Sequence, residues 1–173
     1  LNDDSVEEVI DGTFQVVNEY ELSGRVKYYA ADNSNGIPSA SISLTNSDDE
    51  SFDQTTDTDG YFAFLSMPTT SYSVNVDHNI SVCDQTVSML DASMVAQFHA
   101  GMISFDAEQM IAGDVNGENG VTVYDAALIA QYVVENTDSF GVGAWNSPNV
   151  GPYYIDEDLL GQEIKAVAIG DPS

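Results

Sequence analysis

Alternation of apolar and polar residues runs through roughly the first half of the chain and predicts β-strands. Apolar residues share one parity between Phe14 and Tyr28, which is typical of two short strands or of one long bent strand. Shorter alternating runs follow at 40–44, 61–65 and 72–76, and turn residues such as Asp57-Thr58-Asp59-Gly60 separate them. Short strands with turn chemistry between them predict an antiparallel β-sandwich.

Helical spacing of apolar residues replaces this alternation from Leu90 onward. It predicts one helix from Leu90, a second over 105–112 with Ser104 as its N-cap, and a third over 125–135. After these helices the chain returns to loop, and a last strand is expected over 164–169. The predicted organisation is an acidic leader over 1–12, a sandwich over 13–78, a helical domain over 79–137 and a C-terminal loop with the final strand over 138–173.

An internal repeat lies within the helical part. Residues 87–98 match residues 121–132 at an offset of 34, so that Asp91 coincides with Asp125 and the apolar positions agree in kind. Two copies of a loop-plus-helix unit, joined by a connecting helix, predict a small symmetric helical domain.

The clearest chemistry lies in the twelve-residue loop that precedes the second repeat helix. Oxygen-bearing side chains occupy its positions 1, 3, 5, 9 and 12, which is the ligand spacing of an EF-hand loop, and position 7 supplies a backbone carbonyl. Because calcium takes about six to eight oxygen ligands, Ca²⁺ is the predicted ion. Position 6 is Asn119 where glycine is usual, and asparagine tolerates the left-handed backbone that this turn needs. The expected ligands are Asp114, Asn116, Glu118, Gly120, Thr122 and Asp125.

The first repeat copy predicts a weaker calcium site. Counting back from its final aspartate places Ile80 and Val82 at positions 1 and 3, where neither side chain offers an oxygen. The alternative is a metal-free loop that pairs through its backbone with Val121. The remaining candidate ligands are Asp84, Thr86, Ser88 and Asp91.

Charge narrows the range of partners. The chain has 29 acidic and 3 basic residues, a net charge of −26. Nucleic acids and anionic membrane surfaces are excluded as partners because both are bound by clustered lysine and arginine. Hydrophobic residues make up 43% of the chain, enough for packed cores, but no apolar run is long enough for membrane insertion. The acidity suits inorganic cations or salty water, or serves solubility alone. The first residue, Leu1, is not methionine, as expected of a processed form or of a piece of a longer chain.

Residues 114–135 resemble a dockerin repeat, with a calcium loop that ends in Asp and a helix rich in Ala, Leu and Ile. The duplicated unit, from about 79 to 136, is similar to a divergent dockerin domain. This resemblance implies a non-catalytic module that binds a cohesin domain of another protein. It also implies partner contacts at loop positions 10 and 11 of both copies. In this sequence those residues are Val123, Tyr124, Met89 and Leu90.

Residues 20–77 resemble the carboxypeptidase-regulatory-like or collagen-adhesin B-type β-sandwich, on the stretches 36–44, 56–64 and 72–76. The tail over 164–172 is similar to a segment that often follows such a pairing in long bacterial surface proteins. The two resemblances imply an α+β fold class. An antiparallel β-sandwich of immunoglobulin or prealbumin type would precede a small three-helix dockerin-like domain with duplicated loop–helix units.

Together these features predict a non-enzymatic, calcium-binding assembly module that is extracellular or at the cell surface. Its segment 13–29 is expected to add as a strand either to a neighbouring subunit of a filament or to its own sandwich. One alternative is a dockerin that anchors a larger enzyme or surface protein to a cohesin. Another is a carbohydrate-binding accessory module, with Trp145 and Tyr153-Tyr154 as its candidate platform.

Overall fold

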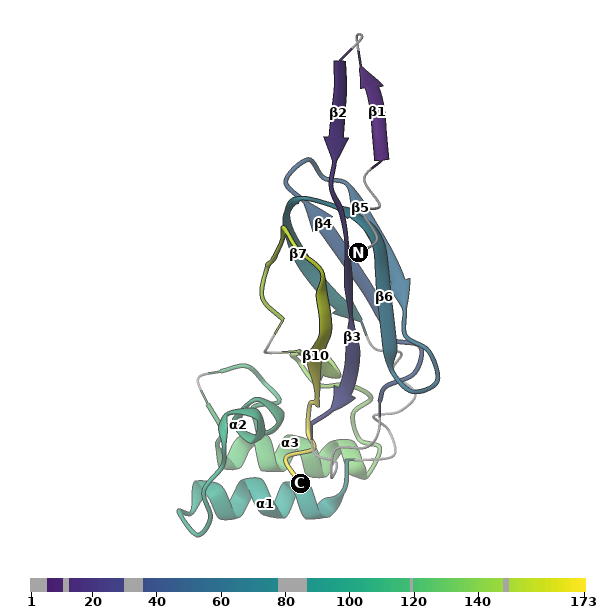
Figure 1. The fold of residues 1–173 in the computed structure, drawn as a ribbon. Coiled ribbons are helices and arrows are strands. Elements are labelled where there is room, and N and C mark those ends of the chain that lie inside the picture. The colour runs from purple at the N-terminus through teal and green to yellow at the C-terminus, as the bar shows by residue number, and fades with distance from the viewer. Residues whose placement is uncertain (1–5, 11–12, 30–35, 78–86, 119, 148–149) are drawn as a thin grey trace. The chain divides into compact units, whose positions relative to one another are not determined.

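The structure is a computed structural model (Figure 1). Its chain divides into two units. The structure describes residues 6–10, 13–29, 36–77, 87–118, 120–147 and 150–173. Of these, the sheet unit takes 6–10, 13–26, 36–77 and 150–164, and the helical unit takes 27–29, 87–118, 120–147 and 165–173. The boundary falls within strand β3 (Glu19–Tyr28) and within strand β10 (Leu159–Ala168), so neither unit is one continuous stretch of sequence.

Two four-stranded sheets contain most of the strands, with the orders β6-β3-β10-β8 and β5-β4-β7-β9. The strands not yet given are β4 (Ser41–Asn46), β5 (Ser51–Thr55), β6 (Tyr61–Pro68), β7 (Thr70–Asp77), β8 (Trp145–Asn146) and β9 (Tyr153–Ile155). The predicted α+β content is confirmed, and the pairs β3–β6, β8–β10, β4–β5, β4–β7 and β7–β9 are antiparallel. The immunoglobulin or prealbumin type of sandwich stays a prediction.

Side chains alternate between core and surface along the sheet unit, as the sequence pattern predicted. On β4, Ile42 and Leu44 are fully buried whereas Ser41 is exposed. The β4–β7 register sets Ile42 opposite Val76. The turn expected at 57–60 is present, because Asp57 Oδ1 accepts hydrogen bonds from the backbone N–H groups of Asp59 and Tyr61 (both 2.9 Å).

Three short strands escaped the sequence analysis. Strand β5 is mostly polar and exposed, with Phe52 half-buried, so it lacks the alternation that reveals a strand. Strands β8 and β9 have two and three residues, too few for any periodicity. Strands β8 and β9 lie in the stretch after Thr137 that was expected to be loop.

The N-terminal residues also differ from the acidic leader that was expected. Strand β1 (Val6–Ile10) pairs antiparallel with β2 (Thr13–Val17), and Val6 stands opposite Val17. The two strands form a sheet of their own, and β3 follows β2 after one residue. Val and Ile favour strands, which explains this pairing despite the acidic neighbours. The segment 13–29 therefore forms two strands, and β2 has its partner within the same chain.

The helical unit contains helices α1 (Met89–His99), α2 (Ala107–Gly113) and α3 (Val123–Val133). Their apolar sides form one core. It includes Ala92, Val95, Val115, Val121, Ala126, Ile129 and, from the C-terminal tail, Ile169. The tail is thus part of the helical unit, although the sequence analysis placed it in a separate segment.

The N-cap of α2 is Asp106, and the expected cap at Ser104 is wrong. Asp106 Oδ1 accepts a hydrogen bond from the Gln109 backbone N–H (2.8 Å), and Gln109 Oε1 accepts one from the Asp106 backbone N–H (3.1 Å). This reciprocal capping box satisfies two backbone donors at once. Serine 104 lacks such a partner three residues on, since that position is Ala107.

Candidate metal centre

The two copies of the sequence repeat have the same hydrogen-bond geometry at the starts of α1 and α3. Thr122 caps α3. The Thr122 backbone N–H (2.9 Å) and the Thr122 hydroxyl (2.8 Å) both donate hydrogen bonds to Asp125 Oδ2. Ser88 caps α1 in the same way, with both distances to Asp91 Oδ2 at 2.8 Å. Both aspartates are fully buried. Each repeat helix therefore has an equivalent carboxylate as its third residue. Helix α3 begins two residues earlier than expected.

Side chains and glycines coil the loop between α2 and α3. Asp114 Oδ1 accepts a hydrogen bond from the Gly117 N–H (2.8 Å), and Oδ2 accepts one from the Gly120 N–H (3.1 Å). Asn116 Oδ1 accepts from the Glu118 N–H (2.7 Å). Both glycines have positive φ angles, 72° and 107°. A Cβ at Gly117 would lie 2.7 Å from a Val142 methyl, so glycine is needed there for space as well.

Asp125 connects the end of this loop to its beginning. Its Oδ1 accepts a hydrogen bond from the Val115 backbone N–H (3.1 Å), next to Asp114 at position 1. Val115 and Val121 are both buried in the apolar core. The loop is thereby anchored at positions 2, 8 and 12.

The donor set suits calcium. The predicted ligands are carboxylate, amide, hydroxyl and carbonyl oxygens, and such mixed oxygen ligands are those that calcium takes in flexible geometry. Carboxylate oxygens that accept one hydrogen bond keep a further lone pair for a cation. Within the described ranges, no three His, Cys, Asp or Glu side chains form a metal cluster on their own. The ligand assignment at 114–125 therefore depends on the neutral oxygens too and stays a prediction. Asn119, at position 6, lies outside the described residues.

The weaker site of the first copy is described only in part. Ser88 and Asp91 lie together, as given above, whereas Asp84 and Thr86 lie outside the described residues. The four residues expected to contact a partner are all exposed. Their exposed fractions are 53% for Met89, 61% for Leu90, 58% for Val123 and 58% for Tyr124. They are the first two residues of α1 and of α3, so the two repeats present equivalent apolar pairs.

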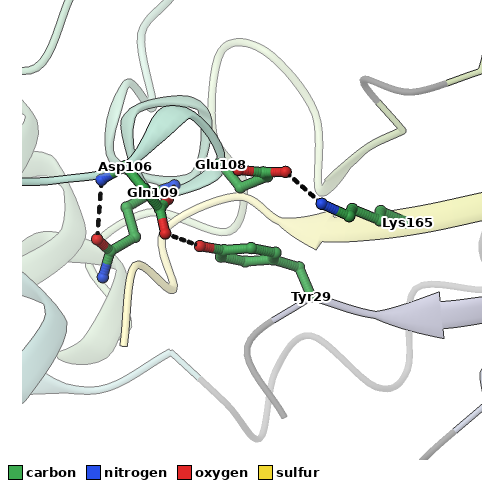
Figure 2. Close-up of polar contacts among 5 residues, drawn as sticks. All are labelled: Tyr29, Asp106, Glu108, Gln109 and Lys165. Carbon is green, nitrogen blue, oxygen red and sulfur yellow. Dashed lines mark hydrogen bonds and ion pairs between the residues drawn. The ribbon is translucent and has the colours of Figure 1, made fainter. Parts of the chain in front are cut away.

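Sequence reasoning missed a polar cluster within the helical unit, in which Tyr29, the residue after β3, meets side chains of β10 and of the start of α2 (Figure 2). The Tyr29 hydroxyl donates to Asp106, the N-cap of α2, and Lys165 forms an ion pair with Glu108 (2.6 Å). Burial, and then the hydrogen bond to Asp106, raise the pKa of Tyr29. The Tyr29 hydroxyl, followed by the Gln109 backbone, lowers the pKa of Asp106. These residues are far apart in sequence and fit no motif.

One family matches part of the chain. Residues 74–134 match the model of the dockerin type I domain, which confirms the dockerin-like domain inferred from the repeat. Dockerin type I domains bind calcium through EF-hand-like loops, and the matched segment contains the loop at 114–125. Dockerins bind cohesin domains and occur in secreted or cell-surface proteins. No curated protein and no solved structure gives a significant match to the chain. Among the described residues, none of the helices has the length and apolar character that crossing a membrane requires.

Proposed function

We propose that this chain is a non-enzymatic, extracellular assembly module that binds calcium at 114–125 and a protein partner at the starts of α1 and α3. The observation that carries the proposal is the position of the exposed apolar pairs. Val123 and Tyr124 follow directly after the cap Thr122, and Asp125 is both the last position of the loop and part of that cap. An ion held by the loop would fix the direction in which these two side chains point.

The partner we propose is a cohesin domain. Dockerins bind cohesins, and the apolar pairs of this chain lie at the positions that the family resemblance implied. Exposed large apolar side chains at a helix start are costly to leave in water, and their burial by a partner is favourable. Because no basic side chain occurs among these four residues, recognition would depend on apolar contact rather than on charge.

Self-assembly through the N-terminal strands is the second candidate. Strands β1 and β2 form a sheet separate from the two larger ones, and an isolated two-stranded sheet is marginally stable in water. Such a hairpin can exchange its partner strand for one from another copy, which would give a filament. The carbohydrate-binding alternative is weaker, because Trp145 packs edge-on against Tyr28 (5.8 Å between ring centres) and is half-buried.

Binding to a panel of purified cohesin domains tests the proposal. We expect binding in calcium that is lost in chelator and in the double variant Val123→Ser/Tyr124→Ser. The matched control is Leu160→Ser, since Leu160 is equally exposed (59%) but lies in the sheet unit. Equal binding by the double variant and the control would refute this surface. If no cohesin binds and light scattering shows filaments in calcium, the self-assembly candidate is supported instead.

A further inference from the structure

Asn116 and Gly117 bring an asparagine side chain next to an unhindered backbone nitrogen. Asparagine is a thermolabile residue, because the nitrogen of the following residue can attack its side-chain amide carbon. Glycine at that following position has no side chain to hinder the attack. Gly117 is exposed to water and Asn116 is half-buried. The loop therefore presents both reacting groups to solvent.

A carboxylate holds the Gly117 backbone N–H. This N–H donates a hydrogen bond to Asp114 Oδ1 (2.8 Å), which is within the reach that a general base needs. A backbone nitrogen becomes a nucleophile only as its proton is removed, and an adjacent base activates a weak nucleophile of this kind. Asp114 is therefore placed to accept the Gly117 proton during the attack.

The Asn116 side chain is held by a second hydrogen bond. Its Oδ1 accepts from the Glu118 backbone N–H (2.7 Å). Attack on the side-chain carbon places negative charge on this oxygen, and a donor already aimed at the oxygen stabilises that charge. The hydrogen bond also restricts the amide to the region of the Gly117 nitrogen, since Asn116 and Glu118 flank Gly117 in the chain. One base and one donor thus serve the reacting pair.

We propose that Asn116 is a site of spontaneous deamidation in the calcium-free loop. The Gly117 nitrogen forms a bond to Cγ of Asn116 and passes its proton to Asp114. The bond from Cγ to Nδ2 breaks, and the leaving nitrogen takes this proton and departs as ammonia. Water then opens the resulting succinimide ring at either of its carbonyls, which leaves aspartate or isoaspartate at position 116. The reaction consumes one water, releases one ammonia and involves no oxidation.

Calcium should protect Asn116, an expectation that rests on the proposed ion site at 114–125. Asp114 and Asn116 are both predicted ligands, so a bound ion would occupy oxygens of the base and of the amide. A carboxylate beside a cation accepts a proton less readily. Isoaspartate inserts an extra carbon into the main chain and shifts the later ligands relative to Asp114. Deamidation would thereby make the loss of calcium irreversible.

Peptide mapping by mass spectrometry, after the full chain has been incubated at neutral pH, tests the proposal. We expect Asn116 to be converted in chelator, and to be converted about tenfold more slowly or less in excess calcium. Asn35, which also precedes a glycine, is the internal reference, and its rate should not depend on calcium. An Asn116 that stays intact in chelator while Asn35 is converted overturns the proposal.

The variant Asp114→Asn, compared with the wild type in chelator, isolates the base. It keeps the shape of the side chain, and we expect the conversion of Asn116 to slow by about tenfold or more. Asp138→Asn, which changes an exposed carboxylate of the same unit outside the loop, should leave the rate unchanged. In urea, all three chains should convert Asn116 at one rate. Equal rates of Asp114→Asn and the wild type in the absence of urea would refute the role of the loop.

Calcium binding separates this proposal from the proposed function. If calcium neither binds to the fresh chain nor slows the conversion, the ion assignment at 114–125 fails while the deamidation site stands. If calcium binds through Asp114 and the rate is unchanged, the protection is refuted. Wild type aged in chelator should lose calcium binding in proportion to its isoaspartate. Asn116→Gln, whose longer side chain closes such a ring more slowly, should keep its initial binding, and equal losses would exclude Asn116 as the cause.

Discussion

The backbone N–H of Gly170 donates a hydrogen bond to the carbonyl of Ala112 (2.7 Å), which fixes the C-terminal tail to the last turn of α2. The preceding residue, Ile169, is buried in the core shared by the repeat helices. On the other side of the tail, Tyr29 N–H donates to the Ala166 carbonyl (2.9 Å). The helical unit therefore includes described residues on both sides of its helices in the sequence, 27–29 before them and 165–173 after them.

Shortening the tail side chain at position 169 should destabilise the helical unit. Ile169→Ala removes a core side chain that is 3% exposed, and we expect a loss of about 2–5 kcal/mol in its free energy of unfolding. The single tryptophan, Trp145, lies in this unit, so urea unfolding followed by its fluorescence measures the effect. Leu160→Ala, at an exposed position, should change the stability by about 0.5 kcal/mol or less. Equal effects of the two substitutions would contradict a structural role of the tail.

Calcium should stabilise the chain through Asp114. For an extracellular site with a dissociation constant of about 0.1–1 mM, a hundredfold excess of calcium adds about 2.7 kcal/mol. Adding chelator should therefore lower the melting temperature of the wild type, and the part of this decrease that comes from the loop should be absent in Asp114→Ala. Glu157→Ala, which removes an exposed carboxylate outside the helical unit, is the control. The loop assignment fails if Asp114→Ala and the control respond equally to chelator.

Loss of the α3 cap should cost stability even without calcium. Thr122→Ala removes the hydroxyl that donates to Asp125 Oδ2 and accepts from the Tyr124 N–H (3.2 Å). We expect a decrease of about 1 kcal/mol, within the usual range for N-caps. Thr122→Ser keeps the hydroxyl and should behave nearly as the wild type. Chemical denaturation in chelator measures both variants, and indistinguishable Ala and Ser variants would mean that the cap contributes nothing.

The hydrogen bond from Tyr29 to Asp106 predicts a pH dependence with two limits. The pKa of Asp106 is lowered in the folded state, so its contribution is present above the ordinary value of about 4 and is lost as the pH falls through the lowered value. The pKa of Tyr29 is raised, so its contribution is present below the ordinary value of about 10 and is lost as the pH rises through the raised value.

The variant Tyr29→Phe isolates this contribution. It should be less stable than the wild type at neutral pH, and the difference should shrink at acid pH and again above about pH 10. Unfolding in urea at a series of pH values, followed by Trp145 fluorescence, gives the comparison. A difference that stays constant from pH 3 to pH 11 would show that packing, and not the hydrogen bond, accounts for the effect of Tyr29.

Local patterns explain what could be predicted from the sequence. The helices and the calcium loop follow from a 34-residue repeat in which Asp91 and Asp125 occupy equivalent places, and the strands follow from alternation, as on β4. Strand β5 is polar because it lies at a sheet edge, so its pattern carries no signal. The hydrogen bond from Tyr28 to Asp171 joins residues 143 positions apart, and no local pattern in either segment predicts it.

Choices between neighbouring residues were also hard to predict. Ser104 and Asp106 are both good N-caps, and the difference lies in Gln109, whose side chain returns the hydrogen bond. The strand pairing of segment 13–29 depends on β1, which contains the strand-forming residues Val6 and Val9. The acidic residues of β1 made this strand hard to predict from the sequence. In both places a partner three or more residues away settled the structure.

The burial of Ile169 sets a condition on transplanting this calcium-binding part into another protein. A graft of residues 74–134 alone would lack Ile169, a buried member of the core that also contains Val95 and Ile129. It would also omit Tyr29 and Lys165, which hold the start of α2. A working graft must therefore carry residues 27–29 and 165–173 as well, so gene exchange that moves this part intact has to move both of its flanks.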